Sequence, residues 1–291
     1  MLILPIKTGL MSFVLWAMMN GGALASKESP QHITSLNLCT DQILMMLVEP
    51  TRIASISHLS RQRAISAMAA VTAKLPINYG KAEEVFMQQP DLVLVGSYTS
   101  RSTVALLRKL GRHVVEVPPA DSFEDIYRNI ATIGKAVGET SKALRLIKQT
   151  KKQLSLFKLE KRTGLPVAAL YFANGYSSGA NTLIDKVVRR AGFNTLAGKL
   201  GFKGTQKLSL EALLFSRPDL LIVAPKDYKG QARAYEVFRH PALKALKNRM
   251  PVTSVVSALT VCGTPQTIKA ISRLQQFRHH HFSRQLPVIS K

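Results

Sequence analysis

The chain contains a weak internal repeat, and this repeat constrains its fold more than any other feature. Residues 83–95 read EEVFMQQPDLVLV, and residues 211–223 read EALLFSRPDLLIV. Both copies begin with Glu, reach Pro-Asp-Leu seven residues later and continue into an apolar run. Since Pro ends a helix and continuous apolarity is typical of a buried parallel strand, each copy predicts a helix, a turn and a strand. Because only two copies occur, they indicate two similar lobes rather than a solenoid.

Other segments of the chain show the same alternation of strand and helix. Short apolar or β-branched runs predict strands at 33–38, 53–57, 114–117, 167–172 and 252–256. Helices are expected at about 41–48 and 182–191. Strands that alternate with helices predict parallel sheets in an α/β fold.

A long helical region lies between the two halves. Ser122 and Asp125 form a capping box, and apolar residues then recur every three or four positions, with an interruption at Gly138. One helix of ~35 residues would reach ~50 Å and join two lobes as a rigid spine. The alternative is two ordinary helices packed within one domain. The expected organisation is a signal peptide over 1–25, a first lobe over 31–121, a connecting helix over 122–160 and a second lobe over 165–285.

Residues 1–25 have the pattern of a secretory signal peptide. A single charge, Lys7, precedes an apolar run over 10–19, and residues 23–25 form a small-x-small cleavage site. The run has about half of the ~20 residues that a membrane-spanning helix needs, which favours a cleaved signal over an uncleaved anchor. The mature chain is therefore expected to begin near Ser26 and to lie outside the cytoplasm.

The composition limits the possible classes of function. With 46% hydrophobic and 20% charged residues, the 291-residue chain is globular rather than disordered or fibrous. The net charge of +23 favours an anionic partner, which can be nucleic acid, a membrane surface or a small molecule. Export and the scattered distribution of the basic residues argue against nucleic acid. The two cysteines exclude a disulfide scaffold and a four-cysteine zinc site, and the chain has no H-E-x-x-H, P-loop or C-x-x-C motif, so no enzyme is expected.

Six segments, taken in order, resemble the periplasmic substrate-binding proteins of ABC importers for iron–siderophores, haem and vitamin B12. They are ITSLNLCTDQILMML, AEEVFMQQPDLVLVGSY, the helix after Ser122, LYFANGYSSGANTLIDKVVRRAG, LSLEALLFSRPDLLIV and VCGTPQT, and they span about residues 33–274. The resemblance implies two Rossmann-like α/β lobes joined by a single long helix, with the ligand in the cleft between them. It also implies a periplasmic, monomeric carrier that delivers its ligand to an ABC permease dimer, without nucleic acid, cofactor or resident metal.

Loops that follow strands supply the candidate ligand-binding residues, because ligands bind outside the carboxyl ends of parallel strands. Tyr98 and Tyr176 offer aromatic faces, and Arg101 offers a fixed planar cation. Asn37 is equally expected as a helix cap. The full set of candidates is Asn37, Cys39, Thr40, His58, Tyr98, Arg101, Tyr176 and Cys262.

The two cysteines allow three interpretations that the sequence does not separate. Cys39 and Cys262 can pair across the cleft and staple the lobes, stay reduced and contact metal or ligand, or be buried as small hydrophobic residues. The run His279-His280-His281 is a weak metal motif, and a solvated tail is the simpler interpretation.

The glutamates that begin the two repeats have a role implied by the resemblance. In this family an exposed Glu on each lobe docks into a basic pocket of the permease, and Glu83 and Glu211 occupy the matching positions. The simpler interpretation is that each acid stabilises a helix N-terminus, and both roles can hold together. The neighbouring Glu84 is an alternative contact in the first lobe.

The expected ligand is an iron complex, either a siderophore or haem. Corrinoid binders of the family typically line the cleft with Trp, whereas the only Trp, Trp16, lies in the expected signal peptide. The basic charge fits an anionic ferric complex held by Arg61, Arg63 and Arg101. The alternatives are a corrinoid, or a cationic envelope-binding module without a small-molecule ligand.

Overall fold

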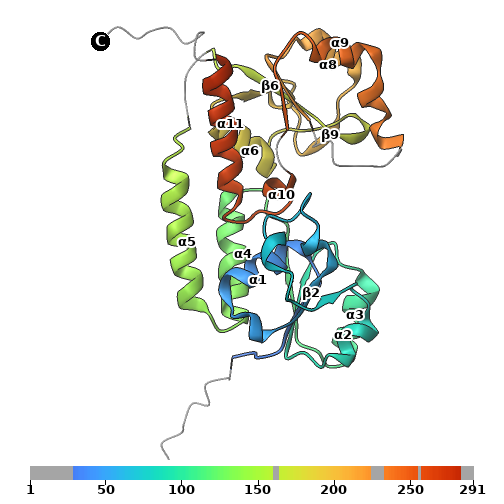
Figure 1. The fold of residues 1–291 in the computed structure, drawn as a ribbon, viewed down its shortest axis with the longest axis vertical. Helices are drawn as coiled ribbons and strands as arrows, with labels where there is room; N and C mark the ends of the chain where they lie inside the picture. Colours follow the sequence, from blue (N-terminus) through green and yellow to red (C-terminus); the bar gives the residue numbers. More distant parts are fainter. Residues whose placement is uncertain (1–28, 160–163, 224–232, 255–256, 283–291) are drawn as a thin grey trace, which may run out of the picture.

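The computed structural model describes residues 29–159, 164–223, 233–254 and 257–282. These residues form two α/β lobes, each built on a parallel sheet (Figure 1). The first sheet has the order β3-β2-β1-β4-β5, and the second has the order β11-β10-β6-β8. The predicted α/β fold with two lobes and parallel sheets is therefore confirmed.

The strands of the first lobe lie close to the predicted segments, with β3 as an addition. They are β1 (Ile33–Ser35), β2 (Ile53–Ser57), β3 (Ile77–Asn78), β4 (Leu92–Gly96) and β5 (Val114–Val117). The second sheet contains β6 (Val167–Tyr171), β8 (Asn194–Thr195), β10 (Leu220–Val223) and β11 (Val252–Ser254). A separate antiparallel pair, β7 (Tyr176–Ser178) and β9 (Thr205–Lys207), follows the second lobe's first strand.

Helices cover both faces of each sheet. In the first lobe they are α1 (Leu38–Leu47), α2 (Ala82–Met87), α3 (Arg101–Lys109), α4 (Phe123–Ala136) and α5 (Thr140–Ser155). The second lobe has α6 (Leu183–Arg190), α7 (Leu196–Lys199), α8 (Leu210–Ser216), α9 (Pro241–Lys247), α10 (Ser257–Thr260) and α11 (Thr267–Phe282). Within the described residues, none of these helices combines the length and the apolarity needed to cross a membrane.

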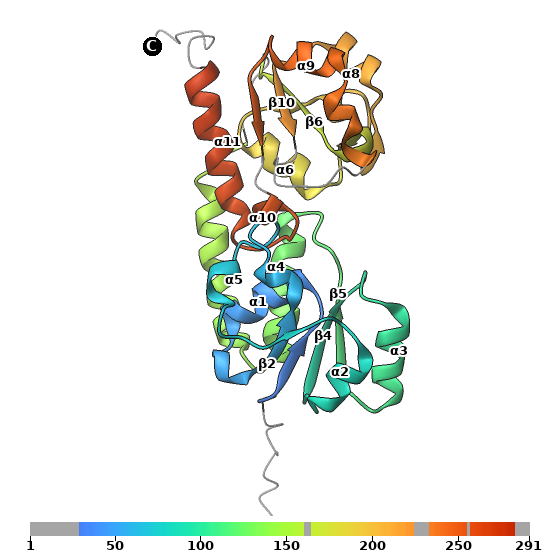
Figure 2. The same cartoon turned by 45° about the vertical axis from the view of Figure 1, so that its right-hand side comes forward.

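One continuous hydrophobic core extends through both lobes. It joins the inner faces of the two sheets to α1, α4, α6 and α11, with Ile130 and Ile271 among its fully buried members. Separate clusters pack α2 and α3 on the outer face of the first sheet, and α8 and α9 on the outer face of the second. Figure 2 shows the resulting stack of two sheets along the long axis, with α10 between them. This shared core opposes large motions of one lobe against the other.

The structure explains why both repeats contain Pro-Asp-Leu. The residues before the prolines, Gln89 and Arg217, both have a left-handed backbone (φ 47° and 42°), which ends the helix. The Asp91 carboxylate then accepts hydrogen bonds of 2.8 Å from the backbone N–H groups that lead into β1. Asp219 accepts one of 2.7 Å from the N–H of Val167 in β6. Each Asp therefore fastens the first strand of its lobe beside the repeat strand.

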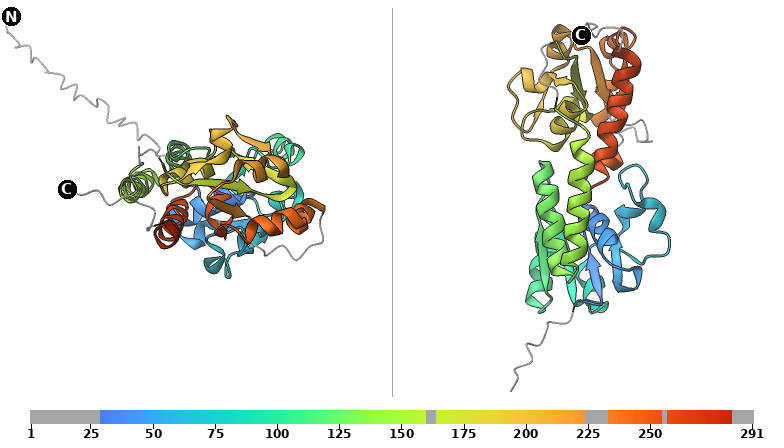
Figure 3. Two further views of the ribbon diagram at one scale, coloured as in Figure 1. Left: turned by 90° about the horizontal axis from the view of Figure 1, so that it is seen from above. Right: turned by 90° about the vertical axis from the view of Figure 1, so that its left-hand side faces the viewer.

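The connection between the lobes differs from the expected single helix over 122–160. α4 ends at Ala136, Gly138 has φ +77°, and α5 begins at Thr140, so the two helices form a hairpin (Figure 3). Arg52 holds this turn, because its guanidinium forms a 2.7 Å ion pair with Glu139. The structure thus has the alternative arrangement of two packed helices, and the interruption at Gly138 is a reversal rather than a kink. α4 packs on the first lobe, and α5 runs back towards the second.

Candidate ligand-binding cleft

A cleft of about 450 Å³ lies between the two lobes. Its first-lobe wall comes from the segments that follow β1, β4 and β5, which meet at the carboxyl edge of the sheet. The second-lobe wall comes from β7, β9, the start of α6 and the segment between α10 and α11. Polar lining residues include Asn37, Thr40, Ser97, Tyr98, Asp121, Asn129, Ser178, Thr182, Thr205 and Thr260.

The segments after β1 and β4 lie against each other. Asn37 is the N-cap of α1, and its side-chain oxygen accepts a 2.9 Å hydrogen bond from the Cys39 N–H. A Cβ at Gly96 would lie 2.6 Å from the Asn37 amide nitrogen, so glycine is needed there. Tyr98 follows on the same loop with 86% of its side chain exposed, and it lines the cleft. Asn37 therefore both caps a helix and contributes to the wall.

The segment after β5 is a part of the wall that our sequence analysis missed. Asn129, on α4, donates a 2.8 Å hydrogen bond to the Pro118 carbonyl and holds residues 118–121 in place. Among the described residues that line the cleft, Asp121 is the one with a charged side chain. The signal was available, because Val114–Val117 was predicted as a strand and the same carboxyl-end rule applies to the loop that follows it.

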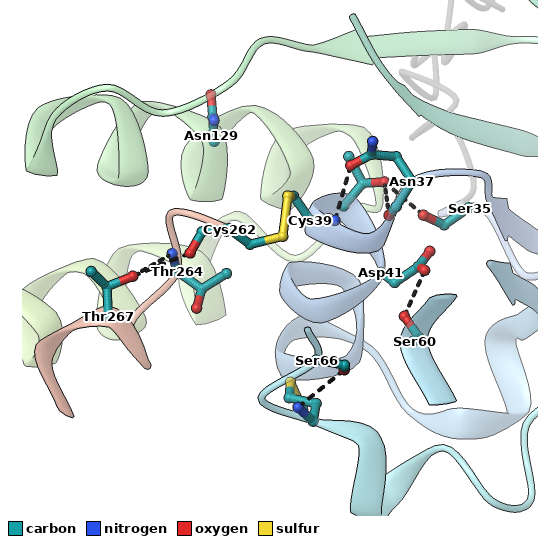
Figure 4. The surroundings of a disulfide bond; sticks show 12 residues. Ser35, Asn37, Cys39, Asp41, Ser60, Ser66, Asn129, Cys262, Thr264 and Thr267 are labelled. Carbon is teal, nitrogen blue, oxygen red and sulfur yellow. Dashed lines mark hydrogen bonds between the residues drawn. A yellow bond between two sulfur atoms is a disulfide. The ribbon is translucent and has the colours of Figure 1, made fainter. Parts of the chain in front are cut away.

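A disulfide bond between Cys39 and Cys262 joins the two lobes at the cleft (Figure 4). The Cα atoms are 5.1 Å apart, and 223 residues separate the cysteines in sequence. The next residue, Gly263, has no room for a Cβ because Ala120 and Ile126 lie against it. Of the three interpretations, the structure has the pairing across the cleft. Neither cysteine therefore offers a thiolate to a metal or ligand.

The described second-lobe wall combines hydroxyl groups with the apolar side chains of Leu183, Ile184 and Val261. The hydroxyls of Ser178 and Thr205 lie 3.2 Å apart across the β7–β9 pair. Thr182 caps α6 by accepting a hydrogen bond from the Asp185 N–H, and it donates one of 2.8 Å to the Gly179 carbonyl. These contacts fix the hydroxyl groups in the wall, where they can hydrogen bond to a ligand.

Four of the eight candidate residues line the cleft, and four do not. Asn37, Cys39, Thr40 and Tyr98 line it. His58 instead stacks on Tyr79, with ring centroids 4.9 Å apart. Arg101 is the first residue of α3, and Tyr176 is 44% exposed at the start of β7. Cys262 is buried in the disulfide.

The proposed arginine clamp is also absent from the described lining. Arg61 donates hydrogen bonds to the backbone carbonyls of Leu75 (3.0 Å) and Ala73 (3.4 Å) of its own lobe. Neither Arg63 nor Arg101 lines the cleft. The described wall thus presents hydroxyl, amide and phenol groups, the Asp121 carboxylate and apolar side chains rather than a set of cations.

Asp41 lies buried behind the first-lobe wall. Its carboxylate accepts hydrogen bonds from the Ser57 N–H (3.1 Å) and the Ser60 hydroxyl (2.7 Å), and so ties the loop after β2 to α1. The other oxygen, Oδ1, has no hydrogen-bond partner among the described residues. Burial raises the pKa of Asp41 to about 8, although the hydrogen bonds from Ser60 and Ser57 lower it. Burial therefore favours the protonated form of Asp41 at neutral pH.

Residues 175–179 read G-Y-S-S-G, which matches the G-x-S-x-G pattern of serine hydrolases. That chemistry needs an exposed serine at a sharp turn between a strand and a helix. Ser177 instead lies inside β7, is fully buried and pairs with Gln206 of β9. The motif therefore does not form a nucleophile in this fold.

The glutamates of the repeats differ in what they contact. Glu84 accepts a 2.8 Å hydrogen bond from the Tyr79 N–H and thus has a structural partner. Glu83 and Glu211 are exposed, and neither carboxylate forms a hydrogen bond or ion pair with a described residue. In the first lobe the geometry therefore favours Glu83 over Glu84 for contact with another protein.

The histidine run ends a helix rather than forming a tail. Residues 279–281 lie in the last turn of α11, where His281 packs on Phe277 with ring centroids 4.2 Å apart. Among the described residues, no group of three His, Cys, Asp or Glu side chains is placed to hold a metal ion.

Comparisons with known proteins agree with this architecture. A family model described as "Periplasmic binding protein" matches residues 33–250. A haem-binding periplasmic protein of Pseudomonas aeruginosa has a similar structure, with 19% identity, a TM-score of 0.71, and coverage of 87% of this chain and 94% of that one. A vitamin B12-binding protein of Vibrio cholerae has 14% identity, a TM-score of 0.60, and coverage of 86% and 96%.

A third similar structure is an Fe3+-hydroxamate transport protein of Saccharomonospora viridis DSM 43017. It has 22% identity, a TM-score of 0.59, and coverage of 85% of this chain and 93% of that one. No curated protein sequence matches the chain. At these identities the structural matches show a shared fold, and the three proteins are named for different ligands.

Proposed function

Because this chain belongs to the periplasmic binding protein family, whose members bind solutes and are not enzymes, we propose that it carries an iron complex to an ABC permease. The complex, a siderophore or haem, binds in the cleft between the lobes of a monomer. The observation that supports this most strongly is the cleft between the lobes, built from the segments after β1, β4 and β5 and lined by both polar and apolar side chains. We also propose that residues 1–25, which lie outside the described residues, are a signal peptide cleaved near Ala25, and the intact mass of the exported protein tests this cleavage.

The lining suits some iron complexes better than others. Its hydroxyl, amide and phenol groups hydrogen bond well to carbonyl, hydroxamate and carboxamide groups. They favour an uncharged ferric hydroxamate over the anionic complex that the basic composition suggested. The same groups match the carboxamides around a corrin ring, so a corrinoid is the second candidate ligand.

Spectroscopic titration tests this proposal. The protein purified from the periplasm is titrated with haemin, a ferric trihydroxamate and cyanocobalamin, each of which has its own visible absorption. We expect saturable one-to-one binding of the ferric trihydroxamate or haemin. Saturation by cyanocobalamin alone would select the corrinoid. If none of the probes saturates and the protein instead binds anionic vesicles in a salt-sensitive manner, the chain is an envelope-binding module and the carrier proposal is wrong.

Tyr98 is expected to anchor the bound complex. Tyr98→Ala should weaken binding of the saturating probe by about 1–3 kcal/mol, because it removes an aromatic contact from the cleft wall. Tyr176→Ala is the matched control, since it removes the same side chain from the first residue of β7, which is not part of the cleft lining. Equal losses in both variants in the titration would contradict this assignment of the cleft.

Glu83 and Glu211 are expected to contact the permease. The double change Glu83→Lys plus Glu211→Lys should slow uptake of the radiolabelled probe by cells at least tenfold, because like charges then face the permease (about 1.4 kcal/mol per tenfold). Probe affinity in solution should stay within twofold of the wild type. Normal uptake would remove the docking role, and lost binding in solution would place these acids in the site or the fold instead.

A further inference from the structure

Two exposed apolar side chains occupy equivalent positions in the two lobes. Met87 is 79% exposed at the end of α2, and Phe215 is 86% exposed near the end of α8. In the repeat, each lies four residues after the glutamate that begins it. A single exposed apolar residue is ordinary, but the same exposure at matched positions of two lobes needs an explanation.

The surroundings of the two side chains are matched as well. Val85 lies two residues before Met87, and Leu213 lies two residues before Phe215. Both are fully buried, so α2 and α8 turn the same face towards their sheets. Residues four apart in a helix lie on one face, with Cβ atoms roughly 5–6 Å apart. Each lobe therefore presents a carboxylate and a large apolar side chain next to each other on its surface.

Both surfaces lie on the same side of the molecule. α2 covers the outer face of the first sheet and α8 covers the outer face of the second, away from the shared core. Figures 1 and 2 show both helices on the side opposite α5. Beside α8 the surface is hollowed by a groove of about 870 Å³ that Leu214, Phe215 and Met250 line. One partner can therefore contact both lobes at once.

We infer that Met87 and Phe215 dock into apolar sockets on the two subunits of the permease, beside the contacts of Glu83 and Glu211. This inference rests on the proposed carrier function. An ion pair exposed to water contributes little to binding, whereas strong contacts are surrounded by neighbours that exclude water. Met87 and Phe215 are the neighbours that exclude water from the contacts of Glu83 and Glu211. Because each stands beside an acid on a basic chain, it fits a partner socket that carries a base, and the repeat matches a partner with two equivalent subunits.

Competition binding tests the inference. Right-side-out inner-membrane vesicles from cells that carry the importer bind labelled wild-type protein, and unlabelled variants compete. We expect Met87→Gln plus Phe215→Gln to compete at least tenfold more weakly than the wild type. The control is Leu144→Gln plus Leu156→Gln, which changes two side chains, 59% and 75% exposed, in and after α5 on the opposite side. The control should compete within twofold of the wild type.

Photo-crosslinking gives a second measurement, which identifies the protein that each side chain contacts. A benzophenone amino acid at position 87 or 215 should crosslink to a polytopic permease subunit, and one at position 156 should not. Crosslinks from 87 and 215 to other proteins only, or none, would overturn the inference. The inference would also be overturned if the Met87/Phe215 variant competes normally while the Glu83→Lys plus Glu211→Lys variant fails to compete. In that case docking through the two glutamates would still stand. If the glutamate variant also competes normally, the proposed delivery to the permease fails as well.

Discussion

Replacing Cys39 and Cys262 with serine is expected to lower the free energy of unfolding by about 5 kcal/mol. The bond closes a chain segment with a sequence separation of 223 residues, and the loss of unfolded-chain entropy grows with the logarithm of that length. Serine keeps the small size of each side chain, so packing around the site changes little. Urea denaturation of the oxidised wild type and the double-serine variant at pH 7 gives the difference directly.

Reduction of the wild type is the internal control for this experiment. Adding dithiothreitol should bring the unfolding midpoint of the wild type down to that of the double-serine variant, and it should leave the variant unchanged. If the wild type keeps its midpoint when fully reduced, the bond between the lobes does not contribute as the loop length implies. Cys39 also lines the cleft. Comparing the probe affinity of the oxidised wild type with that of the double-serine variant therefore shows whether the disulfide bond holds the two walls at the distance that binding needs.

The fold was largely predictable because its signals are local. Leu92–Gly96 and Leu220–Val223 are continuous apolar runs, and such runs are buried on both faces in parallel sheets. The pair of helices α4 and α5 was only the alternative to one long helix, because apolar periodicity continues on both sides of Gly138. Whether a glycine kinks or reverses a helix depends on its tertiary contacts. Here Arg52, far away in sequence, binds the turn at Glu139.

The site was predictable only to the level of its loops. The carboxyl-end rule correctly brought Asn37 and Tyr98 to the cleft, because it follows from sheet topology. It could not tell which side chains of a loop face the cleft, and so it included Tyr176, which does not line it. The cysteine pairing was undecided for a similar reason, since the distance between Cys39 and Cys262 depends on how the two lobes pack.

The stability of the protein is expected to fall as the pH rises from about 4 to about 8, because of Asp41. Its pKa is about 8 in the folded protein, owing to burial, against about 3.9 in an unfolded chain. Between these values the folded state holds a proton that the unfolded state has lost, so unfolding releases a proton and higher pH favours it. The stabilising contribution is complete below the unfolded pKa, falls by roughly 1.4 kcal/mol per pH unit, and is lost above the folded pKa.

Asp41→Asn separates this effect from all other titrations. The amide resembles the neutral carboxyl group and can still accept the hydrogen bonds from the Ser57 N–H and the Ser60 hydroxyl, but it does not titrate. We therefore expect the free energy of unfolding of the wild type to fall, relative to the variant, by about 3 kcal/mol between pH 5 and pH 7.5. Urea denaturation at half-unit steps of pH measures both curves. Parallel curves would mean that Asp41 is already ionised in the folded protein. The loop that carries Leu59 into the cleft would then be held by a buried charge, rather than by a carboxyl group that keeps its proton.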